Sequence, residues 1–247
     1  ISYAQRWNIK VISSTNGHVF AHGNHAERLV RSGLDSIIFS VDGICQQTYE
    51  MYREGGDLAT VLAGVRRVVE AKRALNSTTP LVDLRFIVMR HNEHEVPQLQ
   101  GFAQSLGVDA LTLRTLNTYD DGEFCATSPN GSALLPANSA YQPFELDPED
   151  HSRVRRRANP CKALWNNPAI HCDGKVCPCT FDPHGRYIVG DLNEESFCDI
   201  WWGATYRGLR RRFRDDYRQL VLCCECPCSY EGGAFGEERD MEVHFFE

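Results

Sequence analysis

The sequence predicts an α/β fold with a parallel sheet in its first half, followed by a small cysteine-rich domain. Two observations carry this prediction. Between residues 9 and 116, apolar β-branched segments alternate with segments whose apolar residues recur every three or four positions. Beyond a polar connection, nine of the eleven cysteines lie at or after Cys161. The 247 residues are enough for one large domain and one smaller one.

Four apolar segments are predicted strands: residues 9–14, 35–42, 81–89 and 110–116. Helical spacing of apolar residues lies between them, most clearly over 58–69 and 96–106. Consecutive strands joined by a helix need right-handed crossovers, which make the sheet parallel. Four such units form an open sheet or part of a barrel.

Polar residues follow the predicted strands at their carboxyl ends, where parallel sheets bind ligands. Ser40 and Asp42 are two positions apart and therefore point to the same side of their strand. A hydroxyl and a carboxylate there suit an amino group and a ribose. Composition alone also allows a purely structural interpretation, in which Asp42, Asn16 and Asn92 are ordinary turn residues.

The chain divides into four parts by composition. Residues 1–118 carry the strand and helix alternation, and 119–160 form a polar linker. Residues 161–232 are the cysteine-rich domain, with a predicted β-hairpin turning at Asp173-Gly174 and one aromatic helix over 198–213. Residues 233–247 are expected to be a carboxyl-terminal tail.

Four cysteines have the spacing of a metal site. Cys161 precedes Gly174, four residues separate that glycine from Cys179, and Cys223 and Cys226 form a C-x-x-C pair. Four thiolates suit zinc and an iron-sulfur cluster equally well. Cys177, Cys224 and Cys228 are alternative ligands, whereas Cys172 and Cys198 are expected to pack in the protein interior. The alternative to a metal site is a group of buried free cysteines without a bound metal.

Charge and composition exclude some classes of partner. A formal net charge of -7 argues against binding to nucleic acid or to anionic membranes. The two basic runs, 153–157 and 210–214, are interpreted as solvated faces. No apolar run is long enough to span a bilayer and no secretory signal opens the chain, so a cytoplasmic location is expected. Thiols there stay reduced, which favours metal ligands over disulfides.

Residues 161–230 resemble the SPASM/Twitch domain of radical S-adenosylmethionine (SAM) enzymes. The resemblance rests on the order of the motifs: a first cysteine, Gly-x4-Cys, the turn Gly190-Asp191-Leu192, a helix bearing Trp201, and C-x-x-C. In that family the cysteines hold an auxiliary 4Fe-4S cluster. The resemblance therefore implies one such cluster held by Cys161, Cys179, Cys223 and Cys226.

The first 118 residues resemble the last four parallel strands of a radical SAM (β/α)6-type barrel. The matching segments are 12–17, 39–43 with 49–56, 86–96 and 106–114. In the family, residues at these strand ends lie close to S-adenosylmethionine. The resemblance thus implies a cofactor-binding set comprising Asn16, Gly17, Ser40, Asp42, Asn92 and Arg114.

The chain departs from the family in one respect. The C-x3-C-x2-C loop that holds the radical-generating 4Fe-4S cluster is absent, as is the Gly-Gly-Glu segment. Both are expected upstream of Ile1, so we interpret the chain as a fragment that cannot cleave S-adenosylmethionine by itself.

The resemblance implies a function for the intact protein. A 5'-deoxyadenosyl radical would abstract hydrogen from a peptide, protein or small-molecule substrate. The auxiliary cluster would handle electrons, and the electron donor would be a flavodoxin or a ferredoxin. Arg114 and the acidic residues 119–123 are places to look for catalytic groups. Two alternatives remain: an iron-sulfur electron-transfer or cluster-binding protein without SAM chemistry, and a zinc-stabilised interaction module.

Overall fold

The computed structural model describes residues 1–116, 133–142, 144–145, 147–149, 152–224, 226–233 and 240–246. The chain forms two compact units, and each is described by itself. Unit 1 contains residues 1–116, 133–142 and 237–247, and unit 2 contains 117–132 and 143–236. The acidic stretch 119–123 lies outside the described residues.

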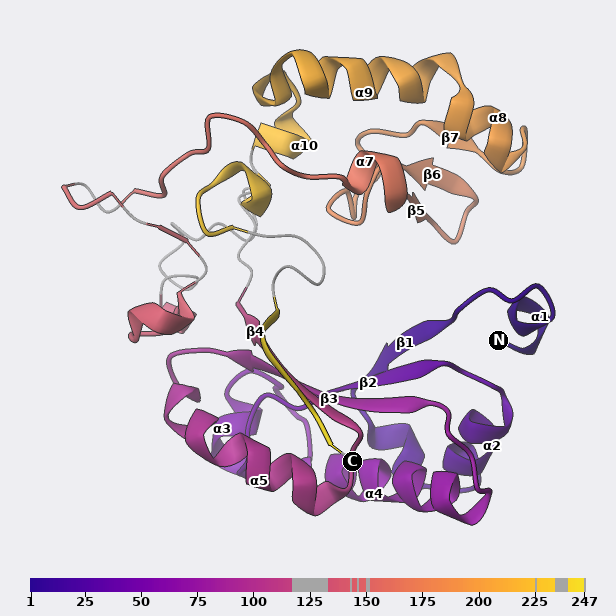
Figure 1. The fold of residues 1–247 in the computed structure, drawn as a ribbon, viewed down its shortest axis with the longest axis vertical. Helices are drawn as coiled ribbons and strands as arrows, with labels where there is room; N and C mark the ends of the chain where they lie inside the picture. Colours follow the sequence, from indigo (N-terminus) through magenta and orange to yellow (C-terminus); the bar gives the residue numbers. More distant parts are fainter. Residues whose placement is uncertain are drawn as a thin grey trace. The chain divides into compact units, whose positions relative to one another are not determined.

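Unit 1 is built on one sheet in the order β1-β2-β3-β4-β8 (Figure 1). The first four strands are parallel, which confirms the predicted sheet, and β8 joins β4 in the antiparallel sense. The strands are β1 (Ile12–Thr15), β2 (Ser36–Ser40), β3 (Leu81–Val88), β4 (Ala110–Thr115) and β8 (Asp240–Phe245). The segment expected to be a tail therefore supplies a fifth strand.

The longer helices of unit 1 cover one face of this sheet (Figure 1). The longer ones are α2 (His25–Arg31), α3 (Gln46–Glu50), α4 (Leu58–Ala74) and α5 (Val96–Leu106), and the short ones are α1 (Ser2–Gln5), η1 (His18–Ala21), η2 (Glu93–Glu95) and η3 (Ser139–Tyr141). Asp57 caps α4 by accepting a hydrogen bond from the backbone N–H of Thr60. Gly107 ends α5 in the left-handed conformation, as its position after the helical pattern predicts.

The core of unit 1 lies between the sheet and these helices. Phe39, Leu84 and Leu111 are side by side on β2, β3 and β4, and each is almost fully buried. Because side chains alternate along a strand, the intervening residues point to the opposite face. There the register places Ser40, Arg85 and Thr112 in one row. The sheet is thus apolar toward its helices and polar on its second face.

Unit 2 contains a small sheet and a set of short helices (Figure 1). The predicted hairpin is confirmed, because β5 pairs with β6 and Gly174 adopts the left-handed conformation at the turn. Its elements are α7 (Ala163–Asn166), β5 (Ala169–Ile170), β6 (Lys175–Cys177), β7 (Gly190–Asp191), α8 (Phe197–Trp202), α9 (Ala204–Asp216), η4 (Tyr217–Gln219), α10 (Val221–Cys224) and η5 (Pro227–Ser229).

The expected aromatic helix is two helices. Gly203 separates α8 from α9 in an extended conformation, and a Cβ there would lie 2.7 Å from the Asp199 carbonyl oxygen. The break lets Trp201 and Tyr206 meet edge to face with ring centroids 5.0 Å apart. Within the described residues no helix is long and apolar enough to cross a membrane.

Candidate functional site

The four cysteines predicted as ligands line one cavity in unit 2. Cys161 and Cys179 come from two separate segments of the chain, and Cys223 and Cys226 come from a third. The rest of the lining is mostly apolar, and it consists of Asn159, Ala163, Leu164, Phe181, Phe213 and Leu222. Four soft sulfur donors in an apolar cavity are the donor set that iron-sulfur clusters use.

Cys179 is held by the loop that follows the hairpin. It is 6% exposed and stands one residue after Pro178, whose carbonyl accepts a hydrogen bond from the Tyr206 hydroxyl at 3.1 Å. The buried carboxylate of Asp182 accepts two further bonds, from the backbone N–H groups of Arg186 and Tyr187, each at 2.8 Å. These bonds fix both sides of the loop and so the position of the sulfur.

Cys161 lies at the start of α7. Its backbone N–H donates to Asn159 Oδ1 at 3.0 Å, and its Sγ accepts a hydrogen bond from the Ala163 N–H at 3.4 Å. Hydrogen bonds to ligand sulfurs tune the reduction potential of a cluster. Cys161 is also partly exposed, whereas Cys179 and Cys223 are buried.

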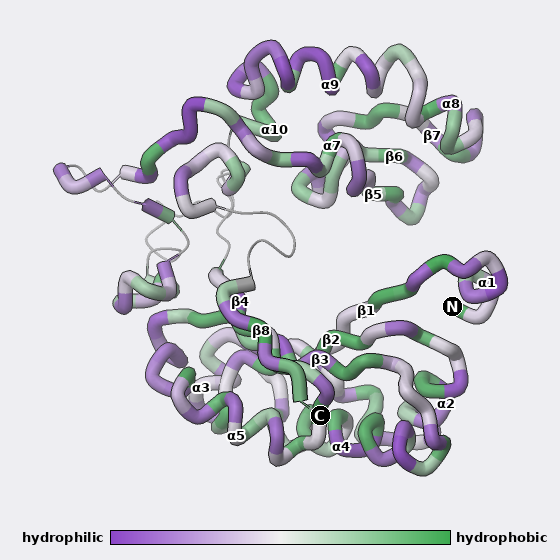
Figure 2. The backbone as a smooth tube through the Cα atoms, in the orientation of Figure 1, coloured by the Kyte–Doolittle hydropathy of each residue, from purple (hydrophilic) through white to green (hydrophobic). Residues whose placement is uncertain are grey.

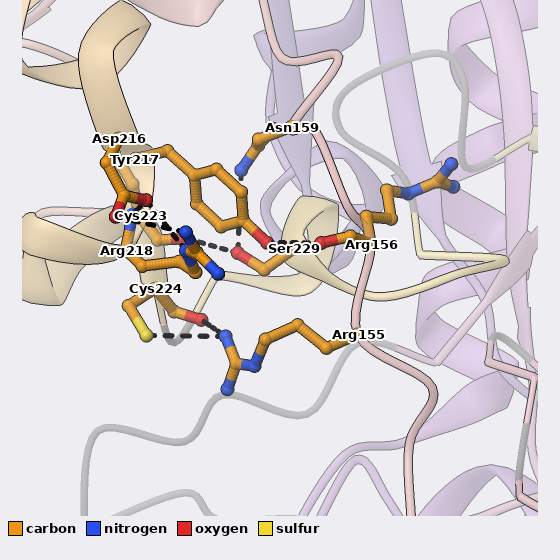
Figure 3. A network of polar contacts seen from close by, with 9 residues as sticks. All are labelled: Arg155, Arg156, Asn159, Asp216, Tyr217, Arg218, Cys223, Cys224 and Ser229. Atoms are coloured by element: carbon orange, nitrogen blue, oxygen red, sulfur yellow. Dashed lines mark hydrogen bonds and ion pairs between the residues drawn. The ribbon is translucent and has the colours of Figure 1, made fainter.

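The backbone around Cys223 is tied to the segment that enters unit 2 (Figure 3). The Ser229 hydroxyl donates to the Cys223 carbonyl, and Ser229 Oγ in turn accepts from Asn159 Nδ2 at 3.4 Å. The Tyr217 hydroxyl donates to the Arg156 carbonyl at 2.7 Å. Asn159 therefore links the loop of Cys161 to the loop of Cys223.

Burial raises the pKa of the Cys179 thiol to about 12, and the neighbouring Cys161 adds to the shift. Burial also raises the pKa of Cys223, with further contributions from Cys179 and Cys161. Without a cation these thiols are protonated at neutral pH. A bound cluster supplies the positive charge that holds them as thiolates, so binding releases protons.

Zinc and an iron-sulfur cluster differ in how closely they bring four sulfurs together. In a tetrahedral zinc site all four sulfurs lie about 2.3 Å from one point. No group of three or more Cys, His, Asp or Glu side chains in the described part of the chain is arranged to hold one ion. In a cubane cluster each thiolate binds a different iron, so the sulfurs stand farther apart.

The remaining cysteines have other surroundings. Cys177, an alternative ligand by spacing, lies 3.3 Å from His171 Nε2 instead of lining the cavity. Cys224 Sγ accepts a hydrogen bond from Arg155 Nη1 at 3.3 Å (Figure 3). Cys172 and Cys198 are exposed, so the expectation that they pack in the interior is wrong. Cys172 follows the short strand β5, and Cys198 lies in the first turn of the short helix α8. Elements this short have too few residues for an apolar pattern to indicate burial.

The two basic runs are only partly solvated, contrary to expectation. In the first run, the Arg153 guanidinium lies 4.2 Å from the Phe144 ring centroid and Arg156 pairs with Glu231 at 2.9 Å. In the second, Arg210 is 7% exposed and stacks on Trp201 and Tyr206 at 4.1 and 4.0 Å. Its guanidinium also donates to the carbonyls of Leu164 and Trp201, both at 2.8 Å.

In unit 1 the predicted cofactor residues lie at the carboxyl edge of the parallel strands. Asn16 and Gly17 follow β1, Ser40 ends β2, Asn92 follows β3, and Arg114 lies near the end of β4. Gly17 has a φ of 88°, and a Cβ there would lie 3.0 Å from Val61 Cγ1. A glycine is thus required where this loop passes over α4.

Asp42 and Asn92 are buried and hydrogen bonded within the protein. The Asp42 carboxylate accepts from Arg53 Nε at 2.6 Å and from the Ile87 N–H at 2.8 Å. Asn92 donates to the carbonyls of Asp42 and Ile87, each at 3.0 Å. Burial raises the pKa of Asp42, and Arg53 opposes that rise. This network joins the ends of β2 and β3 and shapes the edge.

Sequence reasoning missed a polar group on the second face of the sheet. Asp83 accepts hydrogen bonds from Thr112 Oγ1 at 2.8 Å and from Arg85 Nη2 at 3.0 Å. Arg85 is paired in register with Ser40. The sequence does contain a signal for this group. Asp83 and Arg85 are two positions apart in an otherwise apolar strand, and this spacing places both side chains on one face.

Comparison with known proteins gives the family context. Residues 161–227 match the family model of SPASM, an iron-sulfur cluster-binding domain. Over 225 residues the chain is 26% identical to the tungsten-containing aldehyde ferredoxin oxidoreductase cofactor-modifying protein of Pyrococcus furiosus, covering 80% of this chain and 60% of that one. It is also 26% identical over 225 residues to the PqqA peptide cyclase of Gluconobacter oxydans, covering 81% and 57%.

Two solved structures share the fold. Streptococcus suis SuiB bound to S-adenosylmethionine has a TM-score of 0.57 and 14% identity over 94% of this chain and 57% of that chain. Native anSMEcpe with bound AdoMet has a TM-score of 0.52 and 13% identity over 91% and 69%.

The chain spans about 60% of the length of the curated relatives it matches. The match at 161–227 contains all four cysteines that line the cavity, and each of the two solved structures covers more than nine-tenths of this chain. Residues 161–227 therefore match the SPASM iron-sulfur cluster-binding domain, and most of the chain is similar in sequence to the cofactor-modifying protein and the peptide cyclase and in fold to two structures solved with S-adenosylmethionine.

Proposed function

We propose that the intact protein is a radical SAM enzyme and that Cys161, Cys179, Cys223 and Cys226 hold an auxiliary 4Fe-4S cluster. One observation carries this proposal: the four cysteines line one mostly apolar cavity, although they come from three segments of the chain that are far apart in sequence. When bound, a radical-generating cluster would donate one electron to S-adenosylmethionine, whose sulfur–C5' bond would break to give methionine and a 5'-deoxyadenosyl radical that abstracts hydrogen from the substrate. That second cluster is expected on residues outside this sequence.

The residues around the cavity have defined tasks in this proposal. Phe181, Phe213 and Leu222 exclude water from the cluster, which strengthens its electrostatic interactions. The Ala163 N–H donates to a ligand sulfur and Asn159 keeps the two ligand loops in register. Buried protonated thiols become ligands as the cluster enters and their protons leave.

The cofactor-binding set in unit 1 stays a prediction, with two kinds of role. Gly17, Asp42 and Asn92 shape the edge, because the two side chains are engaged with Arg53 and with backbone groups. Ser40, Asn16 and Arg114 retain exposed surface at that edge, and we infer that they contact S-adenosylmethionine.

For the substrate we propose a peptide or protein. PqqA peptide cyclase is named for a peptide, and anSMEcpe has been solved with the Kp18Cys peptide. Other relatives are named for cofactor modification or for pre-heme d1 synthesis, so a small-molecule substrate is the alternative outcome. We further propose a cytoplasmic enzyme that uses a flavodoxin or ferredoxin as electron donor and has neither a nucleic-acid nor a membrane partner.

The first test is anaerobic reconstitution of the 247-residue chain with iron and sulfide. We expect four irons and four sulfides per chain and the absorption of a 4Fe-4S cluster. A colourless protein that binds one zinc would overturn the cluster proposal.

A second test uses the longer parent protein. With a reductant it should convert S-adenosylmethionine to 5'-deoxyadenosine, and Ser40→Ala should raise the KM for S-adenosylmethionine. If the protein binds its clusters but forms no 5'-deoxyadenosine, the radical SAM proposal is wrong and the protein is an electron-transfer protein without SAM chemistry.

A further inference from the structure

Helix α9 presents a row of arginines on the surface of unit 2. Arg207, Arg211 and Arg214 recur at spacings of four and three, so they lie on one face of the helix. All three are exposed, whereas Tyr206, Leu209 and Phe213 face the core. Figure 2 shows α9 as a mostly hydrophilic helix. We call Arg207, Arg211 and Arg214 the arginine row.

The arginine row carries three positive charges, and the exposed Asp215 is its nearest acidic neighbour along the helix. Among the described residues Arg207, Arg211 and Arg214 form no ion pair, whereas the neighbouring Arg218 pairs with Asp216 at 2.7 Å. The whole chain carries a formal net charge of -7. A concentrated positive row on an acidic protein creates a local field that attracts an acidic partner and leaves the rest of the surface repulsive to it.

One end of the row reaches the proposed cluster site. The Arg214 guanidinium lies 5.2 Å from the centroid of the Trp165 ring. Arg214 and Trp165 line an open surface depression together with Lys162, Asn166 and Cys161. Cys161 also lines the inner cavity and is partly exposed, so it belongs to both spaces. The surface around this depression is therefore positively charged and adjoins a proposed cluster ligand.

We propose that the arginine row and Lys162 dock a one-electron carrier protein with an acidic surface, which exchanges electrons with the auxiliary cluster at the Cys161 edge. This inference rests on the proposed function, because it needs the cluster. In the reducing direction, the carrier loses one electron and the oxidised cluster gains it. The reverse transfer uses the same contact.

The arrangement fits such a partner better than a nucleic acid. Nucleic-acid binding needs many phosphate contacts, and an acidic chain repels the phosphates on either side of a short row. Transient redox complexes instead bury little surface and depend on charge steering.

The test is stopped-flow reduction of the cluster-loaded chain by a reduced, strongly acidic flavodoxin at low ionic strength. The variant is Arg207→Glu with Arg211→Glu, since neither side chain contacts the cavity. We expect the second-order rate constant to fall about tenfold or more and its salt dependence to flatten. The matched control is Arg28→Glu with Arg66→Glu, two exposed arginines of α2 and α4 that undergo the same charge change.

The outcomes separate the two proposals. Equal rate constants for variant and control, with clusters intact, overturn the docking surface alone. A chain that binds no iron and sulfide overturns the proposed function instead. Photoreduced deazaflavin, which needs no docking, should reduce both variants equally. Loss of single-stranded RNA binding in the variant, with unchanged electron transfer, would assign the row to nucleic acid and contradict the inference.

Discussion

The two units are stabilised by different means. Unit 1 has one extended apolar core in which the sheet packs against α4 and α5, with residues such as Phe39, Val65 and Leu84 fully buried. Unit 2 has two smaller clusters of buried residues, and three of its four candidate ligands are themselves members of or packed against the smaller one. A bound cluster is therefore expected to matter to the folding of unit 2 and not to that of unit 1.

Buried and partly buried charged side chains also have different structural roles in the two units. In unit 1, Asp42 with Arg53 and Asp83 with Arg85 organise the edge and the second face of the sheet. In unit 2, Arg210 fills a core position by stacking on two aromatic rings and donating to two carbonyls. In this small domain, the long side chain of Arg210 packs against aromatic rings as an apolar side chain would. Three experiments test whether the two units are stabilised separately and by different groups.

The largest effect is expected from Cys179→Ala. The variant should lose most of its iron, because one of four ligands is gone, and residues 161–230 should lose hydrogen-exchange protection. Metal binding contributes on the order of 10 kcal/mol to the folding of comparable structural sites. Unit 1 should keep its protection. Cys172→Ala, at an exposed cysteine, is the control and should retain its iron. Full iron content in Cys179→Ala would refute the ligand assignment.

Leu84→Ala should have the converse effect. Leu84 is fully buried in the central strand β3, and its truncation should lower the free energy of unfolding of unit 1 by about 2–5 kcal/mol. Denaturant unfolding followed by hydrogen exchange gives the value for each unit, and iron content should stay unchanged. Leu84→Met should cost less than about 1.5 kcal/mol. Equal destabilisation of both units would contradict their separate stabilisation.

The smallest effect concerns Asp35, which holds the start of β1. Its carboxylate accepts from Lys10 Nζ at 2.8 Å, the Val11 N–H at 2.8 Å and Gln5 Nε2 at 2.7 Å. The hydrogen bond from Lys10, followed by that from Val11, lowers the pKa of Asp35 to about 2.

A carboxyl group with a depressed pKa stabilises the folded state above its unfolded pKa, and that contribution is lost as pH falls toward the folded pKa. Wild type should therefore be more stable than Asp35→Asn at pH 6, and the difference in Tm should shrink as pH falls from about 4 toward 2. A difference in Tm that does not change with pH would exclude titration of Asp35 as its origin.

Several errors of sequence reasoning have a common origin. Helical periodicity continues through Gly203, yet this residue is extended and separates α8 from α9, and the close carbonyl of Asp199 leaves room there only for a glycine. The strand β8 is far in sequence from its partner β4, so local pattern gives no sign of the pairing. Arginine runs look solvated because charge is usually exposed, whereas Arg153 lies over the ring of Phe144, and Arg210 lies over Trp201 and over Tyr206 of its own helix.

The sequence by itself determined the parallel sheet and the hairpin, and it predicted a metal site among the cysteines at and after Cys161. Periodicity, turn residues and ligand spacing are local properties, and each is readable over a few tens of residues. Only the tertiary structure decided which cysteines share the cavity, that Asp42 and Asn92 face inward, and that the arginine row ends beside Cys161. These facts depend on contacts between residues far apart in the chain, which are set by packing and hydrogen bonding in the folded state.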